Sequence, residues 1–219
     1  MRRRLAGRLP SSAGAEKKCL VASEADAARI RDLREHWVAW QPEVVPARLV
    51  FIDESGSTVA MTRTHARSPR GERTSEAVPR NRGTVTTILG ALTVDGLQAT
   101  MTVEGGTDGD VFAAYVEHVL LPILCVGDLV VLDNAAAHKD PRVKALLATA
   151  GAKALYIPPY SPDLNPIELA WAKLKTYLRS VKARTVGALN DAIAAAMKLI
   201  SPNDAIGWFR HCGYTGHAT

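Results

Sequence analysis

The sequence predicts an α/β fold with a mixed central sheet, in which an antiparallel meander is followed by parallel strands, flanked by helices. In the first half of the chain, apolar runs rich in β-branched residues follow one another across short turns, as in a meander. In the second half, short apolar runs alternate with helical patterns, which is typical of parallel strands joined by helices. With 219 residues, 47% of them apolar and 22% charged, the chain has the size and composition of one substantial globular domain.

A single helix is expected before the meander. Apolar residues recur at helical spacing over residues 23–40, Ser23 can cap the start, and Pro42 ends the helix. The run "RLVFIDES" at 48–55 is apolar on both faces, which indicates a central strand. The following "SGS" is expected to turn the chain into further strands at 58–64, 84–94 and 98–103, the last two joined by an Asp-Gly turn.

The second half is expected to alternate helices with strands. Asp140 is a suitable N-cap, with Pro141 at the first helical position and Gly151 as the stop. A proline-rich segment leads into another helix, whose first turn contains Glu168. The other expected elements are a helix at 107–124 capped by Thr107 or Asp108, a strand at 129–134, a helix at 140–151, a strand at 152–157 and a helical stretch at 185–200.

Simple counts argue against several classes of protein. Three cysteines (Cys19, Cys125 and Cys212) lie far apart with no CxxC pair, which argues against a disulfide framework or a zinc ribbon and suits a reducing cytoplasm. No apolar run approaches the roughly 20 residues of a membrane span, so we expect no membrane partner. Neither a GxGxxG nor a GxxxxGK[ST] motif occurs, which disfavours a nucleotide-binding enzyme.

Charge is distributed unevenly along the chain. The net excess of +5 lies in the first 18 residues, which hold one acid and six bases: Arg2, Arg3, Arg4, Arg8, Lys17 and Lys18. Residues 63–82 hold six arginines against two acids, whereas residues 101–140 hold seven acids and one lysine. Basic flanks around an acidic centre fit a polyanion partner whose chemistry occurs at a cluster of acids. Ordinary solvated faces explain the same charges equally well.

Three acids lie at the ends of expected elements. Asp53 and Asp133 each follow an apolar strand, and Glu168 lies in the first turn of a helix. Side chains at the ends of central strands converge in sheets of this kind, and carboxylates there can hold a hard cation such as Mg²⁺. Two such ions can activate an attacking oxygen and stabilise a leaving one in phosphodiester displacement.

Each acid also has a purely structural interpretation. Asn165, Pro166 and Glu168 fit a capping box, with Asn165 as N-cap and Glu168 at the third helical position. Asp53 and Asp133 are equally suited to turns. His138 has no partner at ligand spacing, which favours a loop or core histidine over a metal ligand. On these residues alone, a cap and a metal ligand both remain open for Glu168; a capping Glu is held in one rotamer, which would also suit a metal site.

Two segments carry a resemblance to a known family. "VVLDNAAAHK" followed by "YIPPYSPDLNPIELAWAKLK" resembles the DDE transposases of the mariner superfamily, in their bacterial insertion-sequence branch. "EKKCLVASE", "LVFIDES" and the "RSPRG" loop are similar to the same family, and the 34 residues between Asp133 and Glu168 match the spacing of that branch. The resemblance implies an RNase H-like fold in which Asp53, Asp133 and Glu168 hold two Mg²⁺ or Mn²⁺ ions. Supporting roles beside the site are implied for Asn134, His138 and Asn165.

The resemblance also implies partners and a domain plan. We expect a basic remnant of an upstream DNA-binding region or linker at 1–22, a linker helix at 23–46 and the catalytic domain at 47–219. The expected partners are DNA at the element ends and the target, a second copy in a homodimeric active complex, and an upstream-frame DNA-binding product. Beside the six bases of the tail, DNA contacts are expected from Arg63, Arg67, Arg70, Arg73, Lys173 and Lys175.

The expected function is cut-and-paste transposition in the bacterial cytoplasm, by DNA cleavage and 3′-hydroxyl strand transfer. Alternatives are a stand-alone nuclease on the same fold and a non-catalytic or truncated DNA-binding remnant that acts as a repressor or partner subunit. A carboxylate-pair glycosidase is compatible with the acids alone, but the arginine-rich loop and the motifs favour DNA.

Overall fold

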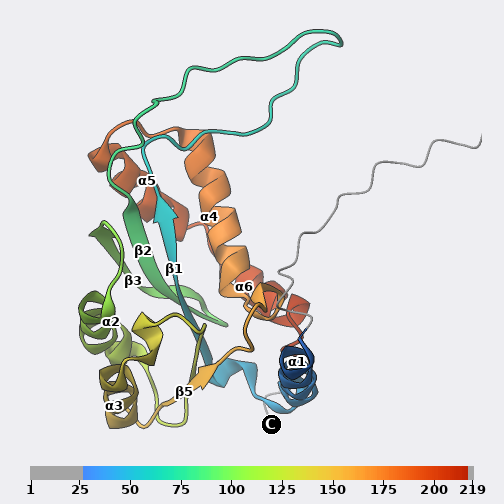
Figure 1. Ribbon diagram of the computed structural model, residues 1–219, viewed down its shortest axis with the longest axis vertical. Coiled ribbons are helices and arrows are strands. Elements are labelled where there is room, and N and C mark those ends of the chain that lie inside the picture. The colour runs from blue at the N-terminus through green and yellow to red at the C-terminus, as the bar shows by residue number, and fades with distance from the viewer. Residues whose placement is uncertain (1–26, 217–219) are drawn as a thin grey trace, which may run out of the picture.

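A five-stranded mixed sheet forms the centre of the computed structural model, which describes residues 27–216 (Figure 1). The strand order is β3-β2-β1-β4-β5. β1 pairs antiparallel with β2 and parallel with β4, so the meander and the parallel half meet at β1. The strands are β1 (Leu49–Ser57), β2 (Thr86–Thr93), β3 (Gly96–Glu104), β4 (Leu129–Leu132) and β5 (Lys153–Tyr156). The predicted fold class is therefore confirmed.

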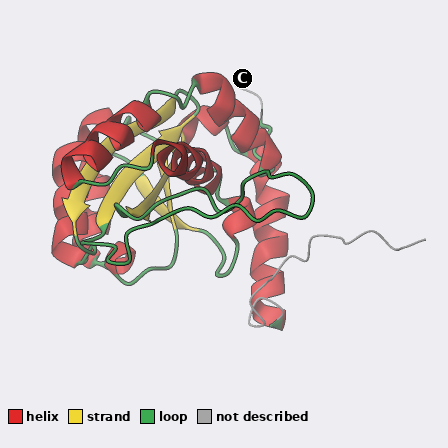
Figure 2. Cartoon of the chain, turned by 90° about the horizontal axis from the view of Figure 1, so that it is seen from above, coloured by secondary structure: helices red, strands yellow, loops and turns green. Residues whose placement is uncertain are grey.

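Helices lie on both faces of this sheet (Figure 2). The two faces are covered by two apolar clusters, one with α1, α4, α5 and α6, the other with α2 and α3. On β1, Phe51 belongs to the first cluster and Ile52 to the second, because successive side chains of a strand point to opposite faces. The helices are α1 (Ala28–Trp40), α2 (Gly109–Tyr115), α3 (Pro141–Thr149), α4 (Ile167–Val181), α5 (Val186–Met197) and α6 (Pro202–His211).

Short helical turns connect these elements. They are 3-10 turns at Gln41–Glu43, Pro46–Arg48, Leu121–Ile123, Ala137–Lys139 and Pro162–Leu164, and a π turn at Val116–Leu120. The prediction of one continuous helix at 107–124 is wrong. The regular helix α2 ends at Tyr115 and is followed by the π turn and a 3-10 turn. Pro122 lies in that last turn, where its missing N–H prevents a regular helix from continuing.

The expected turn at "SGS" and the strand at 58–64 are wrong. β1 runs on to Ser57, since Ser55, Gly56 and Ser57 pair in register with residues 88, 87 and 86 of β2. Residues 58–85 then form a long loop without helix or strand, which projects from the body of the domain (Figure 1). Pairing with β2 therefore overrides the turn propensity of the glycine.

Several local predictions are confirmed, and one helix was missed. Asp108 and Asp140 accept backbone hydrogen bonds at the starts of α2 and α3, and Gly151 has a left-handed φ of 69° after α3. The helix α6 was not predicted, although Ser201 and Asp204 form a capping box at its start. Ser23, the expected cap of α1, lies outside the described residues. In the described part of the chain, no helix is long and apolar enough to cross a membrane.

Candidate acidic site and its supports

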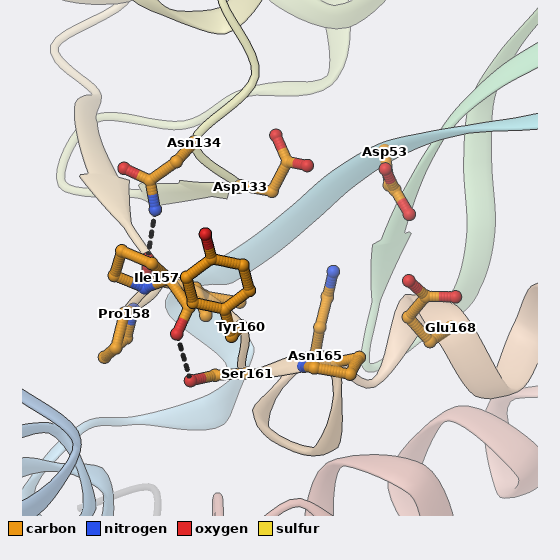
Figure 3. Close-up of a pocket in the computed structure, with 11 residues that line it drawn as sticks. Asp53, Asp133, Asn134, Ile157, Pro158, Tyr160, Ser161, Asn165 and Glu168 are labelled. Atoms are coloured by element: carbon orange, nitrogen blue, oxygen red, sulfur yellow. Dashed lines mark hydrogen bonds between the residues drawn. The ribbon is translucent and has the colours of Figure 1, made fainter. Parts of the chain in front are cut away.

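Asp53, Asp133 and Glu168 line one pocket of about 380 Å³ (Figure 3). Asp53 lies within β1, Asp133 follows β4, and Glu168 lies in the first turn of α4. β1 and β4 are neighbouring parallel strands, paired up to Phe51 and Val131, so the residues two positions further along emerge at the same place. The structure thus brings together the three acids that the sequence singled out.

Asp53 is held by the helix that carries Glu168. Nε1 of Trp171, on α4, donates a hydrogen bond of 3.2 Å to Oδ2 of Asp53. The indole lies against the face of the sheet, over Gly90, which is the β2 partner of Asp53. A Cβ added to Gly90 would lie 2.9 Å from Cη2 of Trp171. Gly90 therefore leaves room for the ring that orients the acid.

The electrostatic environment of Asp53 is strongly negative. Burial, and after it the charges of carboxylates that include Glu168 and Asp133, raises the pKa of Asp53 to about 7. A cation in the pocket would relieve this repulsion, and carboxylate oxygens are the ligands that Mg²⁺ and Mn²⁺ prefer. The donor set therefore fits divalent metal, although no three acidic, His or Cys side chains among residues 27–216 are grouped closely enough for a single ion.

Asp133 is paired with a fully buried histidine. Nδ1 of His138 lies 2.6 Å from Oδ1 of Asp133, out of line for a regular hydrogen bond, and Nε2 lies 3.0 Å from Oε2 of Glu54. Burial lowers the pKa of His138, but the two carboxylates outweigh it and raise the pKa to about 9. The imidazolium in turn lowers the pKa of Asp133. His138 is thus a buried histidine that contacts both Asp133 and Glu54.

Glu54 was not singled out from the sequence. It follows Asp53 on β1, so its side chain points to the opposite face, toward His138. The alternation of side chains along a strand was a signal for this orientation. Nothing in the sequence indicated that a histidine 84 positions away would meet it there.

The predicted capping box at α4 is wrong. α4 begins after Pro166, and Asn165 makes no side-chain hydrogen bond to the helix start. Oδ1 of Asn165 is buried without a hydrogen-bond partner, and the amide points into the pocket (Figure 3). The exposed Glu168 has no side-chain hydrogen bond or ion pair to any other described residue. Its role as a cap, and the rotamer restraint expected from it, are therefore not present.

The proline-rich segment forms the opposite wall of the pocket. Nδ2 of Asn134 donates a hydrogen bond of 2.6 Å to the carbonyl oxygen of Ile157, which ties the residue after Asp133 to the start of this segment. Oγ of the buried Ser161 donates to the carbonyl oxygen of Pro159 at 3.1 Å. The side chain of Asn134 therefore links the two walls of the pocket.

Comparison with known proteins gives a family. Residues 48–190 match the family described as DDE superfamily endonuclease. This chain belongs to that family. No curated protein matches it.

Solved structures with the fold of this DDE endonuclease include the Mos1 transposase. The Mos1 paired-end complex with left transposon end superposes with a TM-score of 0.69 at 15% identity, over 97% of this chain and 64% of the Mos1 chain. The Mos1 transposase catalytic domain with raltegravir and Mg gives 0.66 at 14%, over 88% of this chain and 92% of that domain. The likeness establishes the RNase H-like fold, and the chain spans less than two thirds of the longer Mos1 chain.

The expected DNA contacts of the DDE endonuclease fall into three groups. The bases of the tail, Arg2 to Lys18, lie outside the described residues. Arg63, Arg67, Arg70 and Arg73 are exposed on the projecting loop. Arg184 anchors the base of this loop by donating from Nη1 to the carbonyl oxygens of Val59 and Met61, each at 2.9 Å.

The third group consists of Lys173 and Lys175 on α4, and the two lysines differ in their contacts. Lys173 is engaged by Asp204 on α6, with Nζ 2.7 Å from Oδ2, and this contact is the main reason that the pKa of Asp204 falls to about 2. Lys175 lies with Arg179 and Glu168 along a shallow groove, and neither cation has an ion pair within the described residues. Lys175 is therefore available to a phosphate, whereas Lys173 joins two helices.

This difference predicts opposite effects for two neighbouring lysines. Lys175→Ala should flatten the slope of log DNA affinity against log salt by about 1 unit, the contribution of one phosphate contact. Lys173→Ala should leave the slope unchanged and lower stability by about 0.5–1 kcal/mol, as for a partly exposed ion pair. Because the folded pKa of Asp204 is below its ordinary value, that stability is present above about pH 4 and lost as the pH falls toward 2. Salt titrations and thermal melts of both variants check this, and equal slopes for the two would contradict it.

Proposed function

We propose that the chain is the catalytic domain of a cut-and-paste transposase from a bacterial insertion sequence. The observation that carries the proposal is the convergence of Asp53, Asp133 and Glu168, from three separate elements, on one pocket in a DDE endonuclease. The domain would hydrolyse a phosphodiester at the element end, and the freed 3′-hydroxyl would attack target DNA at a TA dinucleotide. No Ser or Cys nucleophile is needed for either displacement.

Asp53, Asp133 and Glu168 would hold two Mg²⁺ or Mn²⁺ ions, which supply charge neutralisation for an attacking and a leaving oxygen. Structural neighbours include Mos1 paired-end complexes with Mn and with Mg, in agreement with this metal choice. The chain's own contribution is to orient the acids: Trp171 donates to Asp53, and His138 lies against Asp133. Asn134 and Asn165 would complete the surroundings of the substrate.

The proposal includes a DNA-bound, cytoplasmic complex with two copies of the chain. Neighbours such as the Mos1 paired-end complex with left transposon end contain transposon DNA, which supports DNA as the partner. An upstream-frame DNA-binding product would recognise the element ends, and the arginines of the 58–85 loop with Lys175 and the tail would contact phosphates.

The decisive experiment compares wild type and Asp133→Asn on DNA that carries the terminal repeats flanking the gene, with Mg²⁺ or Mn²⁺. We expect cleavage and joined strand-transfer products from wild type, and neither from the variant, which should still fold. Cleavage without joined products identifies a stand-alone nuclease, and binding without cleavage a non-catalytic remnant. Full cleavage by Asp133→Asn would sink the assignment of the acids.

Removal of residues 1–18 should weaken DNA binding without altering its sequence dependence. The segment carries six bases, and each neutralised phosphate contributes about −0.9 to the slope of log affinity against log salt. We therefore expect the slope to flatten by roughly 3 to 5 units if most of these bases engage. Fluorescence anisotropy over a salt series measures it. Much tighter binding of the full chain to its own ends than to scrambled DNA would refute the expectation that its binding is non-specific.

A further inference from the structure

The pocket that contains the acids has a second half, which phosphodiester chemistry alone does not require. Opposite the acids it is lined by the proline-rich segment, with Tyr160 and Asn165 directed into the space (Figure 3). Metal ions and phosphate oxygens need charged or polar ligands, whereas most of this wall is formed by Ile157, three prolines and the ring of Tyr160, and it contains no charged side chain. Its chemistry therefore suits another part of the substrate.

Tyr160 is held in an unfavourable backbone conformation. Its φ of 57° lies in the left-handed region, which is unfavourable for a residue with a side chain. The ring nevertheless remains 51% exposed and has no ring–ring contact with any other described aromatic residue. The flanking Pro159 and Pro162, with the hydrogen bond from Ser161 to Pro159, restrict the backbone here. The segment thus holds an aromatic ring at the mouth of the pocket without packing it into the core.

Asn165 gives an independent indication of a ligand. Its side chain is only 6% exposed, Oδ1 has no hydrogen-bond partner, and the amide points into the pocket between Asp133 and Glu168 (Figure 3). A buried acceptor without a partner is costly, so a ligand group that donates a hydrogen bond to Oδ1 would be favoured. Asn134 offers a contrast, since its amide is already used by the carbonyl oxygen of Ile157.

We propose that this half of the pocket is a subsite for one unstacked nucleobase of the DNA strand whose phosphate lies at the acids. The ring of Tyr160 stacks on the base, and Oδ1 of Asn165 accepts a hydrogen bond from an N–H of the same nucleotide. The inference rests on the proposed function, because metal ions held by the acids would bring the phosphate to this place. Base stacking on an aromatic ring tolerates any sequence, so the subsite selects DNA that is open at the cleavage point rather than a particular base.

The test measures binding of two short single strands of equal length, oligothymidine and an abasic oligomer, to the full chain with Ca²⁺ in place of Mg²⁺. Wild type should bind oligothymidine about tenfold more tightly than the abasic strand, a ratio within the range measured for one base–aromatic stack. Tyr160→Phe keeps the ring and should keep this preference. Tyr160→Ala should abolish it and leave affinity for the abasic strand unchanged.

Tyr160→Gly guards against misfolding, since glycine adopts a positive φ without cost. It should lose the preference as fully as Tyr160→Ala. Asn165→Ala should weaken oligothymidine binding several-fold with no loss of thermal stability, because it removes an amide that has no partner in the fold.

The subsite is refuted if wild type binds the two strands equally, if it binds neither, or if Tyr160→Gly retains the preference. These outcomes are separate from a failure of the proposed function. Cleavage by Asp133→Asn would overturn the role of the acids and leave the base preference untouched, whereas equal binding of both strands would leave metal-dependent cleavage intact.

Discussion

Glu168→Gln should abolish metal-dependent DNA cleavage while the domain melts at its usual temperature. The exposed Glu168 side chain has no hydrogen bond or ion pair to other described residues, so its amide analogue changes the charge of the pocket and little else. Loss of one ligand to catalytic metal removes several kcal/mol of transition-state stabilisation, which corresponds to a rate decrease on the order of a thousandfold. Cleavage rates with saturating Mg²⁺ and thermal melts of the same preparations measure both quantities.

Glu104→Gln is a suitable control, because Glu104 is another exposed acid without a described side-chain partner, at the end of β3. It should cleave at the wild-type rate. Wild-type activity in Glu168→Gln would show that Glu168 holds no metal, and a large fall in its melting temperature would show a structural role that the fold does not reveal.

His138→Ala should cause a large loss of stability. The imidazolium lies between Asp133 and Glu54 and packs against Phe112, with ring centroids 4.3 Å apart. Without it, two carboxylates lose their shared cation, and removing one partner of a buried pair typically costs 3–5 kcal/mol. Both carboxylates are partly exposed, so we expect about 3 kcal/mol, or roughly 6–12 °C in melting temperature for a domain of this size.

One further variant serves as a control, and a double variant separates the contribution of charge from that of packing. His36→Ala removes an exposed histidine from α1 and should leave the melting temperature within about 1 °C. Adding Glu54→Gln to His138→Ala should recover part of the loss, because it removes one of the unpaired charges. No recovery would mean that packing against Phe112, rather than charge, accounts for the contribution of His138.

The sequence was informative about the acids because their positions depend on local signals. The apolar run before Asp133 identifies the end of β4, whereas the run before Asp53 marks only the first half of β1, which continues to Ser57. Because the two strands are parallel neighbours, Asp53 and Asp133 nevertheless meet, as expected. The proline-rich motif placed Glu168 at a helix start. These signals are properties of short segments, which a single sequence contains.

The side chains that contact the acids, Trp171 and His138, could not be predicted, since these contacts join distant elements of the chain. Nothing near Trp171 indicates that its indole reaches a strand 118 positions earlier, and nothing near Glu54 indicates His138. Local propensity also misled where tertiary pairing prevailed. The "SGS" segment became part of a strand because β2 offered partners, and the capping pattern at Asn165 was not used because its amide points into the pocket.

The contact between Gly90 and Trp171 limits how this site can diverge. A methyl group at position 90 would collide with the indole, so a larger residue there requires a smaller one at position 171. The smaller residue, however, would no longer donate a hydrogen bond to Asp53. Positions 90 and 171, neither of which carries one of the three acids, are therefore expected to change together. Among relatives that keep the tryptophan, the position corresponding to Gly90 should be glycine, and loss of this pairing should mark relatives in which Asp53 has lost its hydrogen bond.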